Sequence, residues 1–140
     1  MKQRVFLFLV ILHGFVGSIA FSDEDSIRGF IAVEPFEIRL EAIVKVKAFR
    51  DLWRLSGDAI DAAGRQAVLD NVTTLLETGV NLTSPGVEID FTGRSVRFIQ
   101  PDPQKGYATD ERDSIPVGEA LVGITLSADA RNVREFTAEW

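Results

Sequence analysis

The chain has 140 residues and a net charge of −6, with no cysteine and a single histidine. Without cysteine it cannot be a small secreted scaffold stapled by disulfides, so a hydrophobic core has to stabilise it. Its acidity disfavours binding to nucleic acid or to anionic lipid headgroups, because such binding depends on neutralising phosphate charge.

The first twenty residues have the features of a secretory signal peptide. Lys2 and Arg4 precede an apolar run over 5–12, and small residues follow. Cleavage is expected after Ala20 or after Ser22, since both sites fit the small-x-small requirement. The alternative is an uncleaved membrane anchor, but the apolar run falls short of the roughly 20 residues that a spanning helix needs.

Export would leave a mature part of residues 21–140. The leader carries two basic residues and no acidic one, so its removal changes the net charge from −6 to −8. We expect a periplasmic or extracellular protein with no membrane insertion after leader removal, because no later stretch is apolar enough to span a bilayer. The chain ends inside a predicted strand, so it is also interpreted as the possible front part of a longer protein.

The segment 35–49 sets the pattern of the mature part. Its apolar residues recur at every second position, which is the period of a β-strand and would scatter them around a helix. Fifteen residues are many for a strand, so we expect a bend or bulge near Ile43, the one apolar residue on the charged face. Cover over Ile43 would indicate a second layer on that face. The alternating residues are Phe36, Ile38, Leu40, Ala42, Val44, Val46 and Ala48.

A corner over 51–56 and a helix follow this strand. Trp53 is expected to plug one end of the core. Ser56 or Asp58 is expected to cap the helix, and Gly79 to end it. Apolar residues at spacings of three and four predict the helix, and this stripe should pack on the sheet. The stripe is Ile60, Ala63, Ala67, Val68, Val72, Leu75 and Leu76.

Short strands dominate the rest of the chain. Alternation predicts a hairpin that turns at Thr92-Gly93, whereas the stretch 100–116 has no period and is predicted as a long irregular loop. The other predicted segments are a strand over 80–83, a turn over 84–86, the two hairpin strands over 87–91 and 96–98, and two strands over 119–126 and 133–140 with a turn over 129–132.

These segments predict a single α+β domain over residues 21–140. We expect a mainly antiparallel, sandwich-like sheet of about five to seven strands with one amphipathic helix packed on it.

The chemistry available to the mature part is narrow. The only histidine, His13, lies in the leader, so the mature part has neither His nor Cys. This excludes a Ser-His-Asp triad, a cysteine nucleophile and the usual zinc, haem and iron–sulfur ligands. No Gly-rich phosphate loop is present. We therefore predict no catalytic residue, no cofactor and no metal ligand.

The stretch 100–116 offers the candidates for a contact with a partner. Its carboxylates could instead form a glycosidase pair or hold Ca²⁺, but no calcium-loop spacing is present and Arg112 supplies a cation within the cluster. Tyr107 is the one aromatic residue of the stretch that could anchor a partner. Replacing Asp110, Glu111 and Asp113 by alanine is expected to leave stability unchanged. The candidates are Asp102, Tyr107, Asp110, Glu111 and Asp113.

The order of segments EPFEIRLEA, a capped helix, VRFIQPD, EALVGITLS and FTAEW supports a resemblance. It resembles the front module of uncharacterised bacterial exported proteins, and it is loosely similar to the extracytoplasmic N-terminal region of HupE/UreJ-like membrane proteins. The resemblance covers most of the mature part as an order of elements and implies a longer parent protein. It brings no catalytic motif. Where such ectodomains carry a calcium-like loop before the helix, this chain has SGDAID over 56–61, which disfavours metal binding.

The function predicted from the sequence is an exported, non-catalytic binding or structural module of the cell envelope. Its expected partner is a protein or another envelope component, and nucleic acid is not expected. The two alternatives are a carboxylate-based glycan hydrolase and a calcium-dependent adhesion module.

Overall fold

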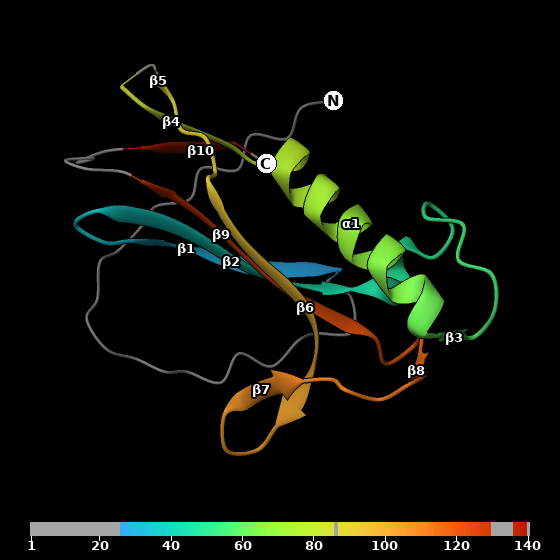
Figure 1. Cartoon of the computed structure of the whole chain (residues 1–140). Coiled ribbons are helices and arrows are strands. Elements are labelled where there is room, and N and C mark those ends of the chain that lie inside the picture. Colours follow the sequence, from blue (N-terminus) through green and yellow to red (C-terminus); the bar gives the residue numbers. More distant parts are fainter. Residues whose placement is uncertain (1–25, 86, 130–135, 140) are drawn as a thin grey trace.

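The computed structural model describes residues 26–85, 87–129 and 136–139 (Figure 1). The predicted signal peptide, both of its cleavage sites and most of the predicted turn over 129–132 lie outside the described residues.

One α-helix, one 3₁₀ helix and ten strands make up the described fold. The helices are α1 (Ala62–Gly79) and η1 (Val46–Phe49). The strands are β1 (Ile27–Val33), β2 (Glu37–Lys45), β3 (Ala59–Ile60), β4 (Asn81–Ser84), β5 (Val87–Glu88), β6 (Gly93–Asp102), β7 (Gly106–Thr109), β8 (Ile115–Pro116), β9 (Leu121–Asp129) and β10 (Thr137–Glu139).

The strands form one main sheet and two small ones. The main sheet has the order β1-β2-β9-β6-β7, and every pair in it is antiparallel. A three-stranded sheet has the order β10-β4-β5, and β3 pairs with β8. The predicted α+β class, a mainly antiparallel sheet with one helix, is confirmed.

The alternation of apolar residues explains the two central strands. Every second residue of β2 and of β9 is buried, and the register places these residues opposite one another, as in the pair Leu40 and Leu126. β2 is shorter than predicted, because the chain turns into η1 after Lys45. The expected bulge near Ile43 is absent from β2, since its pairing with β9 continues without interruption from Glu37 to Lys45. Phe36, predicted to be in the core, lies in the turn before β2 and is 71% exposed.

The helix and the three-stranded sheet form a second layer on one face of the main sheet (Figure 1). Leu76 of α1 and Leu82 of β4 belong to the same core cluster as Leu40 of β2. The layer therefore lies on the face of the even-numbered β2 residues. The opposite face carries Ile43, which is half-buried.

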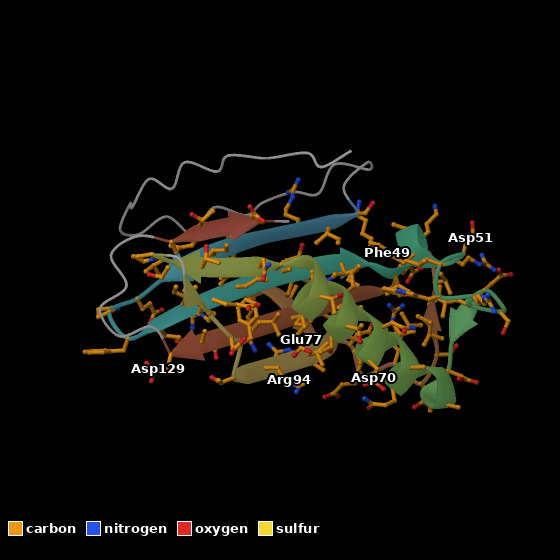
Figure 2. All side chains as sticks on the ribbon, turned by 90° about the horizontal axis from the view of Figure 1, so that it is seen from above. Phe49, Asp51, Asp70, Glu77, Arg94 and Asp129 are labelled. Carbon is orange, nitrogen blue, oxygen red and sulfur yellow. The ribbon has the colours of Figure 1, made fainter. Side chains whose placement is uncertain are left out.

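Helix α1 begins later than predicted. Its N-cap is Asp61, whose side chain accepts a hydrogen bond from the backbone N–H of Gly64 at 2.8 Å, so Ser56 and Asp58 are not the cap. Ile60 lies in β3 and is buried there. Figure 2 shows Glu77 of α1 facing Arg94 of β6, and their charged atoms lie 3.4 Å apart.

The corner before the helix packs partly as predicted. Trp53 is half-buried against the core, and its ring stacks on Phe49 with 4.9 Å between centroids. Leu55 also packs against the core, whereas Leu52 is 70% exposed.

Two predictions about the second half were wrong. No turn at Thr92-Gly93 joins two paired strands, because β5 pairs with β4 and β6 pairs with β9 and β7. The stretch 100–116 is not one irregular loop, since it contains the hairpin between β6 and β7 and the short strand β8. Within the described part of the chain, no helix combines the length and apolar character needed to cross a bilayer.

Candidate functional site

Asp110 is the only charged side chain among the described residues that is buried, with 2% exposed. Its carboxylate accepts hydrogen bonds from Nε and Nη2 of Arg112, at 3.1 and 2.8 Å to the nearer oxygens, and from the backbone N–H of Arg112. The remaining arm of the guanidinium donates to Glu119 at 2.8 Å. These contacts tie the segment after β7 to the segment before β9. Asp110 is therefore a structural group and cannot offer its carboxylate to a partner.

The same contacts decide what Asp110 can do chemically. The hydrogen bond from the Arg112 side chain lowers the pKa of Asp110, although burial acts in the opposite direction. The ion pair in turn raises the pKa of Arg112. A glycosidase general acid needs a raised pKa so that it holds a proton near neutral pH. Asp110 has the opposite property.

The other predicted contact residues differ in their surroundings. Asp102 accepts hydrogen bonds from the backbone N–H groups of Gln104 and Lys105, both at 2.8 Å, and so shapes the turn of the β6–β7 hairpin. Tyr107 is half-buried in β7, whereas Glu111 and Asp113 are exposed. The structure does not assemble the five residues into one cluster.

A hollow of about 430 Å³ lies beside the Arg112 ion pairs. It is open, and the one cationic residue of its lining is Arg112, which already contacts two carboxylates. Its lining offers no second cation for an anionic ligand. The lining residues are Gln100, Pro101, Arg112, Gly118, Glu119 and Leu121. Among the described residues, no group of three or more potential ligand side chains is arranged to hold a metal ion.

Exposed apolar side chains gather at β1, on the side of the main sheet opposite β7. Of the four large hydrophobic residues exposed in the described part of the chain, Phe30 and Val33 belong to β1 and Phe36 to the turn between β1 and β2. Phe30 is 52% exposed on the face opposite the helix, since its register partner is Glu41. The fourth, Leu52, lies in the corner before the helix. β1 and its turn therefore carry three of the four exposed large apolar side chains among the described residues, with Phe30 and Val33 on opposite faces of the sheet.

On its outer side, the backbone of β1 has no strand partner among the described residues. β1 is the first strand of the main sheet and pairs only with β2 among the described strands. The backbone N–H of Lys45 donates to Ser26 at 2.9 Å, and that of Glu34 donates to Glu37 at 2.8 Å. Hydrogen-bonded and non-hydrogen-bonded pairs alternate along an antiparallel ladder. Arg28, Phe30 and Ala32 therefore point their backbone groups at β2.

The odd-numbered residues of β1 point their backbone N–H and C=O groups away from β2, because successive residues alternate. These residues are Ile27, Gly29, Ile31 and Val33. We call the row of backbone groups on these four residues the β1 edge. Such a row is a template for another strand.

Sequence reasoning missed this edge. The stretch IRGFIAV has apolar residues at both parities, with Phe30 and Ala32 on one face and Ile27, Ile31 and Val33 on the other. That pattern indicates a strand with apolar side chains on both faces, and only the sheet order shows that the strand is outermost.

Comparisons with protein-family models, with curated proteins and with solved structures find no match to this chain. The resemblance to the HupE/UreJ group stays a prediction.

Proposed function

We propose that the chain is an exported, non-catalytic binding or structural module of the cell envelope, and that its contact surface is the β1 edge. One observation carries the proposal: the seven-residue strand β1 has no strand partner on its outer side among the described residues, and it carries two exposed large apolar side chains, Phe30 on one face and Val33 on the other. An extended segment of a partner protein can add to such an edge, with the backbone supplying affinity and the side chains specificity. The proposal that the chain is exported is based on the signal-peptide pattern of residues 1–20.

Two features support a non-catalytic role. The mature part lacks His and Cys, so general acid–base work would fall to its carboxylates. The buried carboxylate, Asp110, has a lowered pKa and is bound by Arg112, an arrangement suited to an ion pair. No observation on the described residues favours the glycan hydrolase or the calcium-dependent adhesion module.

A photo-cross-linking experiment tests the proposal. The whole chain is expressed in a bacterial host with a photoreactive phenylalanine analogue at Phe30, and in a second variant at Asp70, which is exposed on α1 (Figure 2). Irradiation is expected to give a discrete protein adduct from position 30 and none from position 70. Mass spectrometry of the exported product shows whether the leader is cleaved after Ala20 or after Ser22.

The proposal is contradicted if the chain is exported and position 30 gives no adduct, or if both positions give the same adducts. It is also contradicted if the chain stays in the cytoplasm with its leader intact.

A further inference from the structure

We infer that the β1 edge binds β1 of a second copy of the chain, antiparallel and about a twofold axis at Phe30. This inference rests on the proposed function and names the partner of the same surface.

The length and centre of β1 favour this occupant. β1 has seven residues, and Phe30 is the middle one. Antiparallel pairing about Phe30 therefore overlaps the whole strand with itself. Ile27 then lies opposite Val33 of the second copy, and Gly29 lies opposite Ile31 of the second copy. All four outward-pointing residues become hydrogen-bonded pairs, with about eight backbone hydrogen bonds in all.

The side chains match in the same register. Phe30 points its own backbone at β2, so across the twofold axis it forms a non-hydrogen-bonded pair with Phe30 of the second copy. Side chains in such pairs are the closest in an antiparallel ladder, and aromatic pairs there are favourable. Arg28 lies opposite Ala32 of the second copy, so this register places no like charges opposite each other within the strand. The exposed Phe30 is thereby covered.

β1 also lacks the features by which edge strands resist pairing. Such strands are usually very short, or carry charges, proline or a bulge. β1 contains a single charged residue, Arg28, and no proline, and its register with β2 runs without a bulge from Ile27 to Val33. The opposite edge of the main sheet is formed by the four residues of β7 and by the part of β6 before Ile99, which carries Arg94 and Arg97. The β1 edge therefore carries fewer charges than the opposite edge, and β1 is the strand better suited to pairing.

Sedimentation velocity of the exported protein tests the inference. Wild type is expected to double its mass between about 1 and about 500 µM, a range typical of a small interface. Phe30→Lys places two ammonium groups opposite each other and is expected to weaken the dimer at least tenfold. Phe36→Lys is the matched control, because it makes the same change at an exposed residue outside β1, and it should dimerise like wild type. A thermal melt of each variant checks that it is folded.

Cysteine cross-linking tests the register, since the chain has no cysteine of its own. Phe30→Cys is expected to form a disulfide-linked dimer on mild oxidation. Ala32→Cys alone is not, because in this register the two copies of position 32 lie about 13 Å apart along the strands, and a disulfide reaches only about 7 Å between Cα atoms. A mixture of Arg28→Cys and Ala32→Cys chains is expected to cross-link.

The inference fails if wild type stays monomeric over the whole range, if Phe36→Lys dissociates the dimer as fully as Phe30→Lys does, or if Ala32→Cys cross-links and Phe30→Cys does not. Its failure is separable from that of the proposed function. A monomeric wild type whose position-30 adduct in cells contains a different protein would overturn the self-pairing and retain the binding role.

Discussion

At the scale of single residues, the Asp110–Arg112 pair shows how the structure changes the interpretation of a sequence feature. The cluster DERD over 110–113 looks like a solvated acidic loop, and the sequence alone does not show which of its carboxylates is buried. In the fold, Asp110 is buried while Glu111 and Asp113 are exposed. The expectation that all three tolerate alanine is therefore revised for Asp110.

We predict that Asp110→Ala lowers the free energy of unfolding by about 2 kcal/mol, because it removes charge-assisted hydrogen bonds from a buried acceptor. The matched control is Asp113→Ala, which changes an exposed carboxylate in the same segment and should stay within about 0.5 kcal/mol of wild type. Urea denaturation at neutral pH measures both. Equal losses in the two variants would contradict a special role for the buried pair.

The pH dependence of the same pair has a defined sign. The folded-state pKa of Asp110 lies below its ordinary value of 3.8, so folding favours the ionised form. The stabilising contribution is present at pH values above about 4 and is lost as the pH falls through the lower folded-state pKa. The free energy of unfolding should therefore fall less steeply with decreasing pH in Asp110→Asn than in wild type. Urea denaturation of both proteins, repeated at pH values below about 5, measures this difference.

At the scale of elements, the three-stranded sheet is part of the core and not an appendage. Leu82 of β4 is 1% exposed and belongs to the core cluster under α1 and β2. Deleting a buried leucine side chain removes apolar burial and leaves a cavity.

We predict that Leu82→Ala lowers the free energy of unfolding by about 2 to 5 kcal/mol. Leu52→Ala makes the same chemical change at a side chain that is 70% exposed, and it should change stability by less than about 0.5 kcal/mol. Thermal and urea denaturation measure both. A Leu82→Ala protein as stable as wild type would mean that β4 does not pack on the main sheet.

The elements that the sequence predicted well are those whose pattern is local. β2, β9 and most of α1 show their buried face as a period within the segment itself. The error at the start of α1 has a local cause too. Ser56, Asp58 and Asp61 all have a capping oxygen, and only the backbone conformation shows that Asp61 reaches the N–H of Gly64.

The strand partners could not be predicted in the same way. The residues Val87, Ile89, Phe91, Val96 and Phe98 alternate as in a hairpin, but pairing depends on segments far away in sequence. β6 finds its main partner in β9, more than twenty residues later. The candidate contact surface depends on the same long-range order, because it is the position of β1 outside β2 that leaves its odd-numbered backbone groups without a strand partner among the described residues.

At the scale of the whole molecule, the described main sheet has a long outer strand, β1, with exposed apolar side chains on both of its faces. α1 and the three-stranded sheet cover one face of the main sheet, and the described strand order ends at β1 on one side and at the short β7 on the other. The proposed binding role and the self-pairing both depend on the β1 edge being open in the single chain.

Amide hydrogen exchange of the purified protein at low and high concentration measures this most directly. In dilute protein, the N–H groups of Phe30 and Ala32 should be protected by β2, while those of Gly29 and Ile31 should exchange rapidly. Raising the concentration should protect Gly29 and Ile31 as the second copy binds. Slow exchange of Gly29 and Ile31 at every concentration would contradict the account, because it would mean that the β1 edge is already paired within the single chain.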